Sequence, residues 1–239
     1  MSASLFTIFA TGLVAGAGHV FAGPDHLAAI APLAAHSPRS AWRSGLSWGC
    51  GHTGGVWALA VLALLSREML PVEWLSSIGE RLVGVVLIGI GLWGFRKASI
   101  TRIHTHEHLH DGVRHTHVHL HTAHAAHDPR RTASTHSHSH AALSVGILHG
   151  VAGTSHLLGV LPALALRSRV EAGAYLLAFG VGSIVAMTVF AGVLGHVARR
   201  WAGAETRAFR TLVNGCSAAA IVVGIVWIYS SGLAPPTTG

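Results

Sequence analysis

Six long apolar stretches, separated by shorter polar connectors, dominate the pattern of the chain. They cover approximately residues 4–35, 41–66, 77–96, 141–166, 171–198 and 210–232. A helix of about twenty residues crosses the hydrocarbon core of a bilayer, so each stretch is long enough for one span. The pattern predicts an all-α, multi-pass protein of a cell (inner) membrane with six transmembrane helices.

Composition and charge agree with this interpretation. Only 10% of the residues are charged, whereas a soluble protein has about a quarter. The formal net charge is +7, and twelve of the sixteen Lys and Arg residues lie in the connectors 36–43, 96–140 and 199–210. Cytoplasmic loops accumulate such residues, so these connectors are predicted to be cytoplasmic and both termini external. The expected partner is therefore the lipid bilayer, and no nucleic acid.

The sequence matches itself when it is shifted by 130 residues. At this shift of 130, His19 aligns with His149, His26 with His156, and Pro32 with Pro162. One further residue of shift aligns Trp48–Gly51 with Phe179–Gly182.

Each copy holds three predicted spans, and an odd number of spans makes the second copy enter the membrane from the opposite side. The sequence thus predicts two inverted three-helix repeats, residues 1–96 and 141–239, joined by a loop at 97–140. Transporters built in this way hold their substrate near the midplane between the repeats. A duplicated helix bundle without a transport role is the alternative.

Polar residues inside the apolar stretches are the candidate chemistry. Asp25 is the only acidic residue well inside such a stretch, and a charge at that depth costs at least a few kcal/mol. A lone histidine in a helix usually serves packing, but here five histidines and one carboxylate are all predicted within the spans. Imidazole nitrogens with a carboxylate oxygen suit Ni²⁺, Co²⁺, Zn²⁺ or Fe²⁺. The candidate metal ligands are His19, Asp25, His26, His52, His149 and His156.

The spacing of His19 and His26 means either that the helix breaks between them or that each histidine serves a different step. In an unbroken helix, His19 and His26 would lie about 10 Å apart, which is too far for two ligands of one ion. Gly23 can leave helical geometry, and Pro24 suits the first turn of a new helix. We expect the first helix of each repeat to be broken, in the second copy at Gly153.

A histidine-rich connector holds thirteen of the twenty histidines. It covers residues 104–140, largely as alternating His-x-His. The tract has too little apolar content to form a core, so it is predicted to be disordered and cytoplasmic. Such tracts bind transition metals, and this one could buffer the metal, sense it or supply the pore.

With these residues the chain resembles the nickel/cobalt transporter family. It is most similar to the compact six-helix branch that includes urease-accessory-type nickel permeases and nickel/cobalt efflux proteins. The specific motif is "HVFAGPDHLAAI", residues 19–30. The resemblance implies that His19, Asp25 and His26 select the metal, and that His52 corresponds to a second family histidine. The best-known permeases have four residues between the first histidine and Asp-His, whereas this chain has five, and they have about eight spans.

The predicted function is secondary active transport of Ni²⁺ or Co²⁺ by alternating access, with the ion as substrate and no bound cofactor. Protons are candidate counter-ions, because histidine titrates near neutral pH. The chain has neither an H-E-x-x-H nor a phosphate-binding G-x-x-x-x-G-K motif, so we expect no enzyme. The alternatives are an intramembrane metalloenzyme, a membrane metal-handling accessory factor, and an exporter of another cation or an anion. The metal, the direction, the coupling ion and a homo-oligomeric state are left open.

Overall fold

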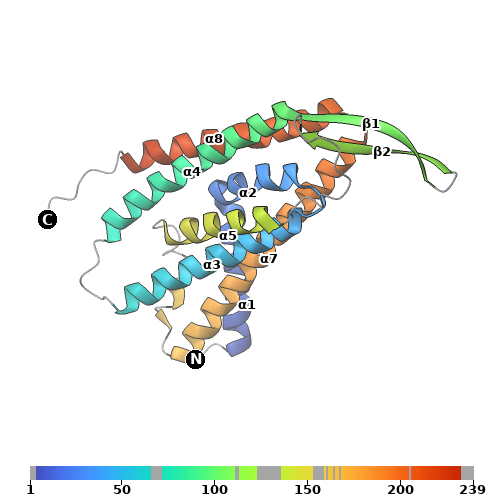
Figure 1. The fold of residues 1–239 in the computed structure, drawn as a ribbon. Helices are drawn as coiled ribbons and strands as arrows, with labels where there is room; N and C mark the ends of the chain where they lie inside the picture. The colour runs from blue at the N-terminus through green and yellow to red at the C-terminus, as the bar shows by residue number, and fades with distance from the viewer. Residues whose placement is uncertain are drawn as a thin grey trace.

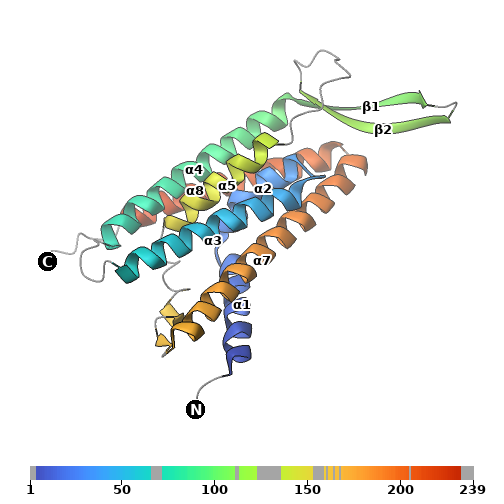
Figure 2. The same cartoon turned by 60° about the horizontal axis from the view of Figure 1, so that its bottom comes forward.

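The structure is a computed structural model of a helical protein with one β-hairpin. It describes residues 4–65, 72–110, 113–122, 136–152, 159, 161–163, 165–166, 168–204 and 206–232. The helices are α1 (Leu5–Ala22), α2 (Pro24–His36), α3 (Ala41–Leu65), α4 (Val72–Ile100), α5 (His136–Val151), α7 (Arg169–Ala204) and α8 (Thr206–Gly232). The strands β1 (Thr101–His110) and β2 (Val113–Thr122) project from one end of the helices (Figure 1; Figure 2).

Four of the described helices are long and apolar enough to cross a membrane, so the chain is a multi-pass membrane protein. The spans are Leu5–Ala22, Ile78–Ser99, Arg169–Trp201 and Arg207–Ser231. Six spans were predicted, and α3 and α5 are not among these four. The helix α5 has only 16 residues. The helix α3 has 25 residues, but the side chains of residues 62–65 at its apolar end lie outside those described, so its span stays a prediction.

The predicted break in the first apolar stretch is present. The helix α1 ends at Ala22 and α2 begins at Pro24, with Gly23 between them in an extended conformation (φ −91°, ψ 102°). Proline is favoured at the first helical position because the N–H that it lacks would have no helical partner there. Asp25 follows in the first turn of α2, where a helix dipole favours negative charge. The corresponding break predicted at Gly153 falls outside the described residues.

The short helix α2 lies in the interior. Ten of its thirteen residues are buried, and they share one core with side chains of α3, α4 and α7, including Trp48, Leu87 and Met187. The outer helices have the opposite character, since Phe6 of α1 is 81% exposed and Tyr229 of α8 is 69% exposed. Large exposed apolar side chains fit a surface that faces lipid. The interior position of α2 puts its first turn inside the bundle.

Glycines allow two pairs of helices to cross closely, α1 with α7 and α3 with α5. Four glycines lie at these crossings, and a Cβ added at any of them would collide with a backbone carbonyl oxygen of the partner helix. Small residues at membrane helix crossings permit such approach. The crossings pair Gly16 with Phe179, Gly146 with Trp48, Gly182 with Leu13, and Gly51 with Leu143.

The histidine-rich connector differs from its prediction in the part that is described. Two segments of it form the antiparallel pair β1–β2, in which His106 lies opposite His117. The physical reason is the alternation itself, because His-x-His with Thr, Val and Leu at the intervening positions has the two-residue period of a strand. The helices α4 and α5 also extend into the predicted loop, to Ile100 and from His136. Residues 123–135 lie outside the described residues.

Candidate metal site

Four helices bring polar side chains together in the interior. His19 lies near the end of α1, Asp25 and His26 in the first turn of α2, His52 in α3 and His149 near the end of α5. Asp25, His26, His52 and His149 are buried, with at most 4% of each residue exposed, and His19 is half-buried. The structure therefore gathers five of the six predicted ligands, and His156 lies outside the described residues.

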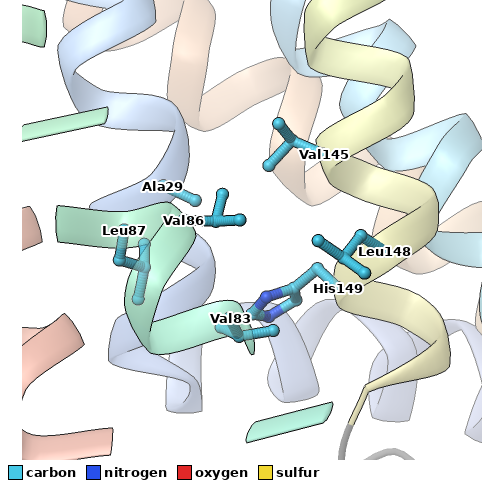
Figure 3. Close-up of a pocket in the computed structure, with 7 residues that line it drawn as sticks. All are labelled: Ala29, Val83, Val86, Leu87, Val145, Leu148 and His149. Carbon is cyan, nitrogen blue, oxygen red and sulfur yellow. The ribbon is translucent and has the colours of Figure 1, made fainter. Parts of the chain in front are cut away.

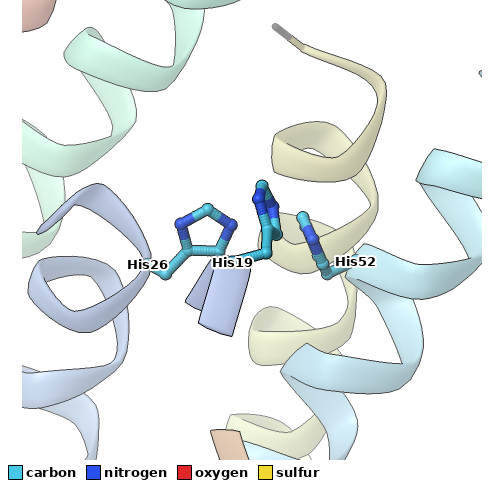
Figure 4. Close-up of side chains that lie close together, drawn as sticks. All are labelled: His19, His26 and His52. Carbon is cyan, nitrogen blue, oxygen red and sulfur yellow. The ribbon is translucent and has the colours of Figure 1, made fainter. Parts of the chain in front are cut away.

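The break at Gly23 produces this proximity. The ring centroids of His19 and His26 lie 4.7 Å apart and their planes are nearly perpendicular, whereas an unbroken helix would separate the two residues by about 10 Å. His52 approaches from α3, with its ring 4.9 Å from that of His26. Figure 4 shows the three imidazoles converging from three helices.

Asp25 is held by two histidines. Its Oδ1 lies 3.1 Å from Nδ1 of His26, and its Oδ2 lies 2.9 Å from Nε2 of His149. An ionised carboxylate can only accept hydrogen bonds, so Nδ1 of His26 donates to it, and Nε2 of His149 lies within ion-pair distance. A buried charge is tolerated when it is paired and hydrogen-bonded. The carboxylate thus links α2 to α5 across the interior.

Two groups of three side chains have the geometry of a metal site. His19, His26 and His52 form one group, and Asp25, His26 and His149 form the other. Within each group, the candidate ligand atoms all lie within 4.8 Å of one another, close to the spacing of ligands around one ion. Nitrogen-rich sets of this kind suit Ni²⁺, Co²⁺ or Zn²⁺ better than Ca²⁺ or Mg²⁺.

Two aromatic residues that were not predicted as site residues pack against the cluster. Trp48 is fully buried, stacks on His52 at 5.4 Å and lies 5.1 Å from the ring of His149. Phe179 lies 5.5 Å from the ring of His19. The alignment of Trp48–Gly51 with Phe179–Gly182 was the signal that could have identified them. Both rings restrict the orientations of the neighbouring imidazoles and exclude water from them.

A small cavity adjoins the cluster at His149. Its volume is about 10 Å³, which is on the order of the space for one water molecule. Figure 3 shows the imidazole of His149 projecting from α5 toward apolar side chains of α4. The lining residues are Ala29, Val83, Val86, Leu87, Val145, Leu148 and His149. His149 is therefore the one polar residue that lines this cavity.

His36 is a further buried histidine that was not predicted to matter. Its Nε2 donates to the carbonyl oxygen of Gly94 at 3.0 Å, and its ring meets the edge of Trp93. The contact ties the end of α2 to α4. Among the described residues, His36 is in neither of the two groups of side chains that could hold a metal ion. Its role here is therefore structural.

Comparison with known proteins finds a relative that matches the chain over most of the length of both proteins. The urease accessory protein UreH of Bacillus sp. (strain TB-90) is 28% identical over 232 residues, which cover 96% of this chain and 93% of the relative. The chain is a homologue of UreH. The predicted resemblance to urease-accessory-type proteins is thereby confirmed.

Two proteins of Arabidopsis thaliana are also homologous. Chloroplast protein FOR GROWTH AND FERTILITY 2 is 31% identical over 221 residues, or 92% of this chain. Chloroplast protein FOR GROWTH AND FERTILITY 1 is 33% identical over 198 residues, or 77% of this chain. The chain spans about half the length of these relatives, 55% and 48%. No family model matches the chain, and no solved structure matches it.

Proposed function

We propose that the protein is a secondary transporter of Ni²⁺ or Co²⁺ in a cell membrane of the bacterial inner-membrane type. The observation that carries the proposal is the buried cluster of one carboxylate and four imidazoles among apolar helices. Ionisable residues at membrane depth are costly, and they commonly line the path of an ion or a substrate. A purely structural cluster would not need ligand atoms this close together.

Two considerations favour nickel or cobalt as the cargo. The nitrogen-rich ligand groups suit late first-row divalent metals. The homology to UreH agrees with the resemblance to urease-accessory-type nickel permeases, which implies nickel as the substrate. The direction of transport and the coupling ion are not part of the proposal.

Alternating access between two inverted repeats is the proposed mechanism. The close helix crossings support it, because they are reciprocal. Gly16 of α1 meets the carbonyl of Phe179, and Gly146, 130 residues later, meets that of Trp48. The helix pairs α1–α7 and α3–α5 would thus exchange under a two-fold rotation in the membrane plane. Ser183 occupies the position in the second copy that corresponds to His52, so the site would be asymmetric.

A membrane metal-handling accessory factor is the second candidate. The thirteen histidines of the connector favour it, because such tracts bind transition metals without a pore. Catalysis is disfavoured, since a hydrolase would need an activated water and a general base, and Asp25 is already engaged by two histidines.

The test is reconstitution of the purified protein into liposomes. A panel of Ni²⁺, Co²⁺, Zn²⁺, Mn²⁺ and Mg²⁺ is presented on either side, with and without a pH gradient. The proposal predicts protein-dependent movement of Ni²⁺ or Co²⁺, and none of Mg²⁺. A protein that binds nickel but moves no metal in any condition would favour the accessory role instead.

A further inference from the structure

The two groups of ligands meet opposite edges of one ring. Nδ1 of His26 faces Asp25 at 3.1 Å. Figure 4 shows the other ring nitrogen of His26 turned toward His19 and His52. The two nitrogens of an imidazole diverge in the ring plane, so one ion cannot bind both. The five side chains therefore cannot act together on a single ion in this arrangement.

His26 also lies midway between two histidines. Its ring centroid is 4.7 Å from that of His19 and 4.7 Å from that of His149, with an interplanar angle of 81° in both cases. His52 is likewise 5.7 Å from both His19 and His149. His19 and His149 are thus equivalent neighbours on two sides of a central pair, His26 and His52.

The two sides have different surroundings. His19 is half-buried, whereas His149 is 3% exposed and borders the small apolar cavity between α4 and α5. The His19 side of the cluster is therefore the more exposed one, and the His149 side borders apolar side chains.

From these contacts we propose that the ion occupies two subsites in turn, first His19–His26–His52 and then Asp25–His26–His149, or the reverse. The inference rests on the proposed transport function and adds the route of the ion within the site. His26 is shared, so an ion could pass from one subsite to the other without returning to water. Two divalent cations on opposite edges of one ring would repel each other strongly, so one ion is bound at a time.

The carboxylate of Asp25 has a different role in each subsite. With the ion in the His19 subsite, Asp25 accepts a hydrogen bond from His26 and orients its ring, as carboxylates do behind histidine ligands. With the ion in the His149 subsite, Asp25 is itself a ligand. Loss of His52 should therefore leave a subsite that contains oxygen, whereas loss of His149 should leave one of nitrogen ligands only.

The experiment measures Co²⁺ binding and Co²⁺ flux with the full chain, because the visible absorption of Co²⁺ reports its ligands. The variants are His52→Gln and His149→Gln, which keep a polar side chain in the interior, with folding checked by gel filtration. His26→Gln is the matched blank, because it keeps the histidine-rich connector but lacks the shared ligand. Spectra are therefore taken as differences from His26→Gln.

The expected result is one ion per chain above the blank in the original protein and in each single variant. The spectra of the two single variants should differ from each other, because only His52→Gln keeps the subsite that contains oxygen of Asp25, and flux should fall at least about tenfold in both. A protein that carries both His52→Gln and His149→Gln should bind no more Co²⁺ than the His26→Gln blank. Two ions per chain in the original protein, or loss of binding in each single variant, would overturn the two subsites.

The same experiment distinguishes an error in the two-subsite proposal from an error in the proposed transport function. If the original protein binds one Co²⁺ above the blank and moves none, the transport function is wrong. The difference spectra of His52→Gln and His149→Gln then still decide whether two ligand sets exist, because they do not depend on flux.

Discussion

At the scale of single residues, Gly23 both separates α1 from α2 and leaves room for the side chains that follow it. Its backbone N–H donates to the carbonyl of His19 at 3.1 Å, and its carbonyl accepts from the N–H of His26 at 3.2 Å. A Cβ at this position would collide with Nδ1 of His26 and lie 2.8 Å from Oδ1 of Asp25. The glycine therefore permits the hydrogen bond between those two side chains.

We predict that Gly23→Ala impairs the site while the protein still folds. The backbone at Gly23 is in a region open to any residue, so the cost falls on the side chains of His26 and Asp25, which must move. Displacing such oriented ligands typically lowers metal affinity about 10- to 100-fold. The matched control is Gly18→Ala in α1, where an added Cβ meets nothing within 4 Å.

Nickel binding by equilibrium dialysis and thermal unfolding in detergent together check this prediction. Gly18→Ala should behave as the original protein in both. Unchanged nickel affinity in a folded Gly23→Ala protein would show that the contact between Asp25 and His26 is not needed to hold the ion.

At the scale of secondary-structure elements, the helix crossings fix where the ligands lie. His19 follows Gly16 by three residues and His149 follows Gly146 by three. Residues three apart share a helix face, so each close crossing also presents a histidine near the partner helix. Phe179 and Trp48, whose carbonyls the glycines meet, are the aromatics against His19 and His149.

We predict that Gly16→Ala and Gly146→Ala destabilise the protein by similar amounts. In each case the added Cβ would collide with a backbone carbonyl, and overpacking of this kind costs about 1–3 kcal/mol. The controls Gly89→Ala and Gly215→Ala lie in helices where an added Cβ meets nothing within 4 Å. Denaturation in detergent should therefore show a lower free energy of unfolding for the first two variants than for the two controls. Equal stability of all four variants would argue against close helix packing.

The connector between α4 and α5 has a separable role in the proposed mechanism. We predict that a peptide of residues 101–135 binds several Ni²⁺ weakly at pH 7.5, because each site must order the chain at its own cost. Binding should weaken sharply below about pH 6, as imidazoles with an ordinary pKa of about 6.5 take up protons and lose their lone pairs. Titration calorimetry at both pH values measures this directly.

Replacing residues 101–135 by a short Gly/Ser linker keeps α5, which begins at His136. If the connector buffers the metal, the apparent affinity for nickel changes but the maximal rate stays within a few-fold. A correctly inserted protein that loses all flux would mean that the connector takes part in transport itself.

At the scale of the whole molecule, sequence predicted the features that single residues control. The Gly23–Pro24 break and the approach of His19 to His26 followed from local rules about glycine, proline and helix rise. The contact of Asp25 with His149 could not be predicted, because it depends on how α2 and α5 both pack around α3. Trp48 was missed although its alignment with Phe179 marked it, because the alignment alone does not say which side chains an aromatic residue contacts.

The β-hairpin shows a feature that composition alone did not predict. Low apolar content predicted disorder for the connector, but the His-x-His alternation has the period of a strand. The inverted repeat stays a proposal, supported by the shared offset of 130 residues and by the reciprocal crossings.

The most direct measurement of the central claim is Ni²⁺ flux into liposomes that contain the original protein, Asp25→Asn or Glu171→Gln. Asp25→Asn removes the carboxylate that holds His26 and His149, and Glu171→Gln removes one in the first turn of α7, outside both ligand groups. The account predicts flux for the original protein and for Glu171→Gln, and a loss of at least about tenfold for a folded Asp25→Asn. Equal Ni²⁺ flux in all three proteins would contradict it.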